Sequence, residues 1–205
     1  MKKVKWNLKN NSRVLIIAEV ANAHQGSMEQ AEKMVKAAAE AGADAVKFQL
    51  FTADELCVKA HSRYEHFQKL ELSHEKTQTL YNLARKNKLL FFCDALGYES
   101  AEFLMSLPAD GIKVHSADMS NVNLLNLLTG WEGTIMLSCG GASEHEIHRA
   151  LSILSPSEQK IILLHGFQSF PTPLEETHLK RMGHIRETFH LPVWFMDHID
   201  AEDEM

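Results

Sequence analysis

The sequence predicts a single α/β domain of the (β/α)8 TIM-type barrel class, and three observations support this prediction. Short apolar, β-rich runs alternate with amphipathic helical stretches along almost the whole chain. The first strand lacks the GxGxxG turn that usually follows the first strand of an open dinucleotide-binding sheet. Polar side chains stand at the carboxyl ends of nearly every strand, as they do where a barrel builds its active site from strand ends.

Seven runs are predicted to be strands. They cover residues 14–20, 45–51, 89–95, 111–116, 134–140, 160–166 and 193–199. Six helices are predicted between them, over residues 27–41, 73–87, 98–107, 121–128, 143–154 and 174–189. Because strands and helices alternate, the connections should be right-handed crossovers and the sheet should be parallel.

Local signals justify several of these boundaries. Ser27 with Gln30, and Ser143 with Glu146, have the spacing of capping boxes, in which the two side chains satisfy free backbone N–H groups at a helix start. Gly42 is a typical stop for the first helix. A barrel closes with eight strands, and the seventh predicted strand ends shortly before Met205. We therefore expect residues 1–205 to form one barrel domain, incomplete at its carboxyl end and without a second domain.

Bulk properties exclude several function classes. A net charge of −6 argues against nucleic acid or an anionic membrane as a partner. No apolar run is long enough to span a bilayer, and the amino terminus lacks the apolar segment of a signal peptide. Cys57, Cys93 and Cys139 have no CxxC spacing, so reduced thiols in a cytoplasmic protein are expected.

Two lysines within apolar strands are the strongest chemical signal. Lys47 and Gln49 share one face of the strand at 45–51, because side chains alternate across a strand. Lys113 lies in the strand at 111–116. Burying a lysine is costly unless it is paired or needed for function. Two such strands predict an active site for an anionic substrate.

Most of the polar residues at the strand ends lie within eight sequence segments, whose order and spacing can be compared with those of known families. The residues that form the strand ends are Glu19, Lys47, Gln49, Asp94, Lys113, Ser116, Ser138, His165 and His198. The segments around them cover residues 16–27, 41–49, 70–73, 112–118, 136–140, 163–165, 170–173 and 197–198. In order and spacing this series resembles the sialic acid synthases, and the resemblance runs from about residue 14 to residue 199.

The resemblance implies a reaction and a set of roles. Sialic acid synthases condense phosphoenolpyruvate with an N-acylated amino sugar, such as N-acetylmannosamine, to give a nonulosonic acid and phosphate. By resemblance, phosphoenolpyruvate would be bound by Lys47, Lys113, Ser116, Ser138 and Gln168. Glu19, Lys47 and Gln49 would be the catalytic residues. Asp118 and Phe170 would contact the sugar.

The resemblance also implies a metal and a state of assembly. His198 matches one ligand of a divalent ion, manganese or magnesium, that polarises the sugar aldehyde. The second ligand is expected outside this chain, on an eighth strand. Only small-molecule partners are expected, and a homodimer is expected of the full-length protein.

Departures from the family pattern leave the sugar open. His115 stands where the family has glycine, Asp118 where it has glutamate, and Phe170 where it has tyrosine. Gln168 replaces an asparagine, and Asn22 is not followed by a second asparagine.

Two other readings stay open at this point. A barrel lysine can attack a carbonyl, so a Schiff-base aldolase is one alternative. A non-catalytic fragment that binds a ligand or a partner is the other.

Overall fold

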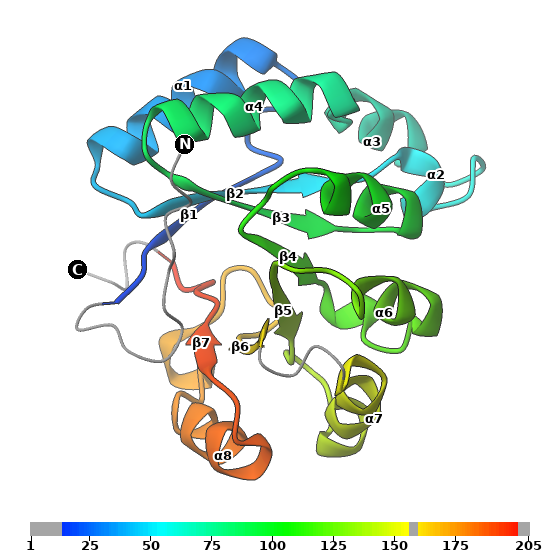
Figure 1. The fold of residues 1–205 in the computed structure, drawn as a ribbon, viewed down its shortest axis with the longest axis vertical. Coiled ribbons are helices and arrows are strands. Elements are labelled where there is room, and N and C mark those ends of the chain that lie inside the picture. The colour runs from blue at the N-terminus through cyan, green and yellow to red at the C-terminus, as the bar shows by residue number, and fades with distance from the viewer. Residues whose placement is uncertain (1–13, 156–159, 201–205) are drawn as a thin grey trace. The chain divides into compact units, whose positions relative to one another are not determined.

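The computed structural model describes residues 14–155 and 160–200, and it confirms the predicted alternation of strands and helices. All seven predicted strands are present in the described ranges (Figure 1). The chain forms two compact units that divide between Lys113 and Val114, and each is described by itself.

The described part of the amino-terminal unit, residues 14–113, contains three complete strands, most of a fourth, and five helices. These elements are β1 (Ile17–Ala21), α1 (Met28–Glu40), β2 (Ala45–Leu50), α2 (Ala53–Leu56), α3 (Tyr64–Leu70), α4 (His74–Lys86), β3 (Leu90–Ala95), α5 (Tyr98–Ser106) and β4 (Gly111–Val114), whose last residue belongs to the second unit. Strand β2 pairs in parallel with β1 on one side and with β3 on the other. Every residue of β3 is buried, as expected for a parallel strand covered on both faces.

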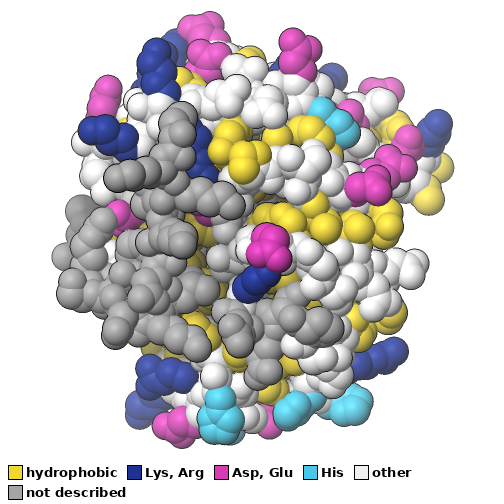
Figure 2. Space-filling view, in the orientation of Figure 1, with side chains coloured by type: hydrophobic (Ala, Val, Ile, Leu, Met, Phe, Trp, Pro, Cys, Tyr) yellow, Lys and Arg dark blue, Asp and Glu magenta, His cyan; other side chains and the backbone are white. Residues whose placement is uncertain are grey.

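Helices α1 and α4 lie side by side over these strands (Figure 1). Helix α1 buries Ala31, Val35 and Ala38, whose spacing of three and four residues places them on one face. Gly42 ends this helix with a φ of +83°, a left-handed conformation that costs glycine little. Acidic and basic side chains are interspersed on the visible surface over α1 and α4 (Figure 2). Glu29 and Lys33 of α1 form an exposed ion pair.

The carboxyl-terminal unit contains the remaining strands. The elements within its described residues are the 3-10 turn η1 (Ser116–Asp118), α6 (Val122–Leu128), β5 (Thr134–Ser138), α7 (Glu144–Leu154), β6 (Ile161–His165), the 3-10 turn η3 (Leu174–Glu176), α8 (Lys180–Phe189) and β7 (Val193–Phe195). Strand β6 pairs in parallel with β5 and with β7. All five residues of β6 are buried.

Some predicted boundaries were wrong. The helix predicted over residues 174–189 is interrupted: η3 is followed by His178 in a left-handed conformation, and α8 begins only at Lys180. Strand β7 ends at Phe195, so His198 follows the strand instead of lying in it. Ser116 likewise belongs to η1, just after β4. Helix α3, which is short and mostly polar, was not predicted. No helix in the described ranges is long and apolar enough to cross a membrane.

Candidate active site

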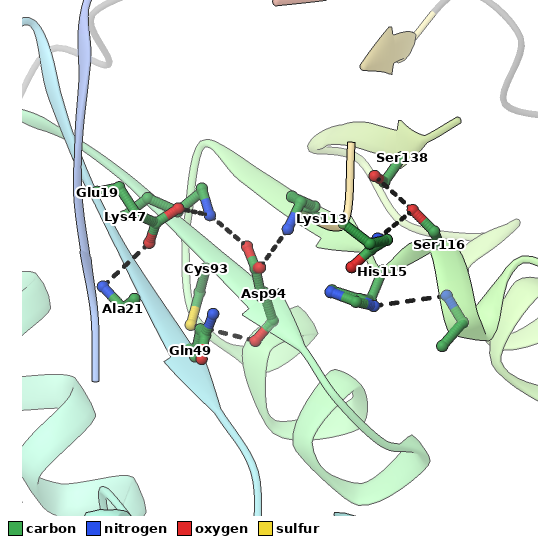
Figure 3. A network of polar contacts seen from close by, with 12 residues as sticks. Glu19, Ala21, Lys47, Gln49, Cys93, Asp94, Lys113, His115, Ser116 and Ser138 are labelled. Atoms are coloured by element: carbon green, nitrogen blue, oxygen red, sulfur yellow. Dashed lines mark hydrogen bonds and ion pairs between the residues drawn. The ribbon is translucent and has the colours of Figure 1, made fainter. Parts of the chain in front are cut away.

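Four charged side chains of the amino-terminal unit meet in one cluster, which we call the lysine–carboxylate cluster: Glu19, Lys47, Asp94 and Lys113 (Figure 3). The Lys47 ammonium donates to Asp94 Oδ1 over 2.7 Å. The Lys113 ammonium donates to the other oxygen of the same carboxylate, Oδ2. Lys47 also forms an ion pair with Glu19. The two lysines that the sequence singled out therefore converge on a single buried carboxylate.

Strand register places these groups. Glu19 is the direct neighbour of Lys47 across the β1–β2 pair, and Gln49 is the neighbour of Asp94 across β2–β3. Beyond Glu19 the register of β1 shifts, and the Ala21 N–H donates to Glu19 Oε1 over 3.0 Å. Irregularities of this kind re-aim side chains at strand ends, often beside active sites. Here the shift fixes the Glu19 carboxylate against Lys47.

Three side chains of the cluster are almost completely shielded from solvent, and the fourth is partly exposed. The side chains of Lys47, Lys113 and Asp94 are 8%, 4% and 0% exposed, whereas that of Glu19 is 43% exposed. A ligand in solution can therefore approach the cluster through Glu19. Cys93, next to Asp94 in the chain, is buried, and burial raises the pKa of its thiol well above the ordinary value. That thiol adds no charge to the cluster.

The charges of the cluster shift one another's pKa values. Burial alone would lower the pKa of Lys47, but the Asp94 and Glu19 carboxylates outweigh it and raise that pKa. Burial would raise the pKa of Asp94, but the two ammonium groups reverse the effect and lower it. The pKa of Glu19 is raised, chiefly by partial loss of solvation and also by Asp94, against the opposing effect of Lys47. Lys47 is thus held as an ammonium ion, and Glu19 is the carboxylate of the cluster that protonates more readily.

Gln49 is held by a residue that the sequence did not mark for a role. The Asn22 amide nitrogen Nδ2 donates to Gln49 Oε1 over 2.8 Å. The buried Asn22 Oδ1 has no hydrogen-bond partner among the described residues. Because its carbonyl is occupied by Asn22, Gln49 keeps its own amide N–H groups for other partners. This arrangement is compatible with the predicted role of Gln49 in orienting a substrate, which stays a prediction.

Neutral hydroxyl and amide groups line a pocket in the carboxyl-terminal unit. Ser116 Oγ and Ser138 Oγ are 2.9 Å apart, and Gln168 Nε2 donates to Ser116 Oγ over 2.8 Å (Figure 3 shows the two serines). Ser116 and Gln168 line a pocket, which we call the hydroxyl pocket, with a volume of about 460 Å³, and the buried Ser138 contacts it through Ser116. Its lining residues are His115, Ser116, Ala117, Met119, Ser120, Gly140, Gly141, Ala142, Glu146, Arg149 and Gln168.

The chain approaches itself closely beside this pocket. A Cβ atom on Gly140 would lie 2.3 Å from the backbone oxygen of Gly166, so only glycine fits where the loops after β5 and β6 meet. Glu146 on the rim is occupied by the Ser143 capping box, which lowers the pKa of its carboxyl. Arg149 supplies a cation from α7. Hydroxyl, amide and guanidinium donors together suit an oxyanion.

Asp118 and Phe170, the two predicted sugar contacts, lie outside the lining of this pocket. Asp118 Oδ1 accepts a weak hydrogen bond of 3.5 Å from Asn121, which caps α6. Phe170 is 81% exposed, and its ring stands edge-on to the His198 imidazole with centroids 5.6 Å apart. Their contact with a sugar therefore stays a prediction.

His198 has the hydrogen bonding of a metal-ligating histidine. Its Nδ1 is 2.6 Å from the Phe167 carbonyl oxygen, so Nδ1 donates to that oxygen, and in the neutral imidazole the lone pair lies on Nε2. Within residues 14–155 and 160–200, however, no group of three or more His, Cys, Asp or Glu side chains is arranged to hold a metal ion. The described residues thus fit a metal only in part, through one imidazole.

Comparison with known proteins identifies the family. The family model described as "NeuB family" matches residues 34–203, which is most of the chain. The chain belongs to the NeuB family. It is similar to the N,N'-diacetyllegionaminic acid synthases of Legionella pneumophila, with 31% identity over 89% of this chain and 57% of the relative, and of Campylobacter jejuni, with 32% identity over 91% and 61%. The chain thus spans little more than half the length of these curated relatives.

A solved structure supports the same assignment. The N-acetylneuraminic acid synthetase of Leptospira borgpetersenii, determined in complex with citrate, matches with a TM-score of 0.86 and 27% identity, over 91% of this chain and 65% of that one. This NeuB-family chain has the predicted α/β fold class, a TIM-type barrel.

Asp94 is the residue of this NeuB-family chain whose importance sequence reasoning missed. It was recognised as a polar strand end, but no role was given to it. Its partners Lys47 and Lys113 are 47 and 19 residues away along the chain, and no local pattern links them. Arg149 was missed for a similar reason. In the sequence it has the pattern of a solvated helix residue, and only the structure shows that it lines the pocket.

Proposed function

We propose that this chain carries the catalytic barrel of a phosphoenolpyruvate-dependent synthase, which joins phosphoenolpyruvate to an N-acylated amino sugar and releases phosphate. N-Acetylmannosamine or a related hexosamine would be the acceptor, and a nonulosonic acid the product. The relatives support this proposal, since they are synthases of N,N'-diacetyllegionaminic acid and of N-acetylneuraminic acid. Residues 1–205 would form one barrel domain. The eighth strand and the homodimer of the full-length protein remain predictions.

The observation that carries the proposal is the convergence of two buried lysines. Lys47 and Lys113 reach the same carboxylate from strands β2 and β4, next to the partly exposed Glu19. Phosphoenolpyruvate carries a phosphate ester and a carboxylate, and two fixed ammonium groups are suitable hydrogen-bond donors to these anionic groups. Ser116, Ser138 and Gln168 would add neutral donors to the phosphate oxygens.

The residues would act in the following sequence. The π electrons between C2 and C3 of phosphoenolpyruvate form the new bond from C3 to the aldehyde carbon of the open-chain sugar, whose oxygen takes up a proton. Water adds to C2, and Glu19 accepts the proton that this water loses. The bond between C2 and the phosphate oxygen then breaks, and the proton of the new C2 hydroxyl passes to the departing phosphate, which leaves a keto group and inorganic phosphate. Glu19 suits this role because its pKa is raised and its exposed side can return the proton to solvent.

His198 would hold the divalent ion that the family implies, through Nε2. The hydrogen bond from Nδ1 to the Phe167 carbonyl fixes the tautomer that such a ligand needs. The ion, when bound, would polarise the sugar aldehyde. Phe170, edge-on to the same imidazole, would cover one side of it.

The Schiff-base alternative has less support than condensation. A lysine that attacks a carbonyl must lose its proton, which a lowered pKa favours. The carboxylates of Asp94 and Glu19 have the opposite effect on Lys47. Borohydride reduction in the presence of a keto acid separates the two reactions, because only an aldolase forms a covalent adduct on lysine.

A phosphate-release assay tests the proposal directly. Residues 1–205 are assayed alone and fused to the remaining carboxyl-terminal part of the Legionella relative, with phosphoenolpyruvate, Mn²⁺ and either N-acetylmannosamine or a diacetylated hexosamine. We expect the fusion to release phosphate only when both substrates are present, and the shorter chain to be silent. A folded fusion that releases no phosphate with any acylated hexosamine, or that forms a borohydride-trapped adduct, would overturn the proposal.

A further inference from the structure

Asp94 occupies the place between the two lysines where a bound anion would be expected. Its carboxylate is fully buried, and each of its oxygens accepts a hydrogen bond from a different ammonium group. A single side chain thus spans Lys47 and Lys113 as a bidentate ligand anion would (Figure 3).

The lysine–carboxylate cluster is also balanced in charge. It contains two ammonium groups, Lys47 and Lys113, and two carboxylates, Glu19 and Asp94. No other Lys or Arg of the described residues forms an ion pair with either carboxylate. A further anion brought against this neutral group would meet a buried carboxylate at close range, where like charges repel strongly.

We propose that Asp94 is a resident counter-anion, which weakens the binding of free anions to the two lysines that it spans. That phosphoenolpyruvate is one of these anions rests on the function proposed above. The effect on inorganic phosphate does not. In this view anion affinity follows the net charge of the cluster: it is low when the cluster is neutral, lower when it is negative, and high when it is positive.

A merely structural role predicts something different. Buried ion pairs are often retained for fold specificity, and removal of one partner destabilises a protein. If Asp94 served only the fold, its replacement would lower stability and leave anion affinity unchanged or reduced. A gain of affinity is the outcome that a structural role cannot produce.

Four proteins form the test: wild type, Asp94→Asn, Lys113→Met and the double variant. Their clusters carry formal charges of 0, +1, −1 and 0. Calorimetric titration with inorganic phosphate and with phosphoenolpyruvate, at constant ionic strength, should show at least tenfold tighter binding by Asp94→Asn than by wild type. Lys113→Met should bind phosphate at least tenfold and phosphoenolpyruvate at least thirtyfold more weakly, and the double variant should return to within about threefold of wild type.

Asp110→Asn is the matched control. Asp110 lies in the same unit, is 19% exposed and pairs with Arg85 over 2.6 Å, so the substitution removes an ion-paired carboxylate outside the cluster. It should leave the affinity for both anions unchanged. Equal gains in Asp110→Asn and Asp94→Asn would overturn the proposal, because they would show an effect of overall charge.

Loss of folding does not prevent the test. If Asp94→Asn folds only when phosphate is added, the anion has replaced the missing carboxylate, which supports the proposal. If it does not fold at all, Lys113→Met is compared with the double variant, which must regain at least threefold in affinity. Unchanged or weaker phosphate binding in a folded Asp94→Asn, or no regain in the double variant, overturns the proposal. If phosphate follows the predicted order while phosphoenolpyruvate does not bind, the inference stands and the proposed function fails.

Discussion

In the amino-terminal unit the charged side chains of Lys47, Asp94 and Lys113 are almost completely buried, whereas neutral groups dominate the hydroxyl pocket of the carboxyl-terminal unit. Every charge of the lysine–carboxylate cluster already has an opposite partner within the chain. Ser116 Oγ, on the pocket lining, bonds to the buried Ser138 and accepts from Gln168, and the lining residues Gln168 and Arg149 are exposed. The lysine–carboxylate cluster is held together by buried ion pairs, whereas the hydroxyl pocket has neutral hydrogen bonds that a ligand can replace.

This difference determines how each region should respond to mutation. A buried charge that loses its partner keeps its desolvation cost, so the loss is large. A hydroxyl that loses a neutral partner gives up about 1 kcal/mol. Substitutions in the cluster should therefore have larger effects than substitutions at the pocket.

Lys47→Met should be the most destabilising change. It leaves Glu19 without a cation and Asp94 with only one, so the free energy of unfolding should fall by about 3–5 kcal/mol. Urea denaturation measures this, with Lys33→Met as the control, because Lys33 is 71% exposed and its pair with Glu29 should be worth less than about 1 kcal/mol. Equal losses in the two variants would show that the cluster is not the buried, tightly coupled region described here.

The contribution of Asp94 should disappear in acid. The two ammonium groups lower the folded-state pKa of Asp94 below its ordinary 3.8, so the unfolded chain binds the proton at higher pH than the folded one. The ion pairs therefore stabilise the fold fully above that value, and this stabilisation is lost as pH falls through the lower, folded-state pKa. The stability difference between wild type and Asp94→Asn, measured by chemical denaturation, should be constant near neutral pH and shrink in acid. A difference that grows on acidification would contradict the assignment.

Ser138→Ala should give the smallest effect. The substitution removes one buried hydroxyl, while Ser116 keeps its bond from Gln168. Affinity for phosphoenolpyruvate should fall about fivefold, or about 1 kcal/mol. Ser152→Ala, which removes an exposed hydroxyl bonded to the His148 carbonyl of the same unit, should have no effect on titration. Matching affinities for all three proteins would remove Ser138 from the binding site.

Local chemistry allowed much of the fold to be predicted from the sequence. The capping box of Ser143 and Glu146 formed as predicted, because its partners are three residues apart. The box at Ser27 formed only by half: Ser27 accepts from the Gln30 N–H, but the Gln30 side chain donates to the Ala23 carbonyl. There the loop before the helix, which no local pattern specifies, offered a competing acceptor.

The site was predictable as a set of residues but not as an arrangement. Strand periodicity identified Lys47 and Lys113 as buried cations, and both are buried. That they share Asp94 depends on the register between three strands, which hydrophobic pattern alone does not fix for these side chains. The interruption before α8 and the orientation of His198 against the Phe167 carbonyl depend likewise on contacts within loops.

Calorimetric titration of wild type and Lys113→Met with phosphoenolpyruvate tests the central claim most directly, which is that the lysine–carboxylate cluster governs binding of the anionic substrate. Removing one cation that interacts with a bound phosphate or carboxylate costs about 2–5 kcal/mol. Affinity should therefore fall at least thirtyfold, a change of about 2 kcal/mol, while Lys33→Met leaves it unchanged. Equal affinities for wild type and a folded Lys113→Met would contradict the claim and remove the cluster from the substrate site.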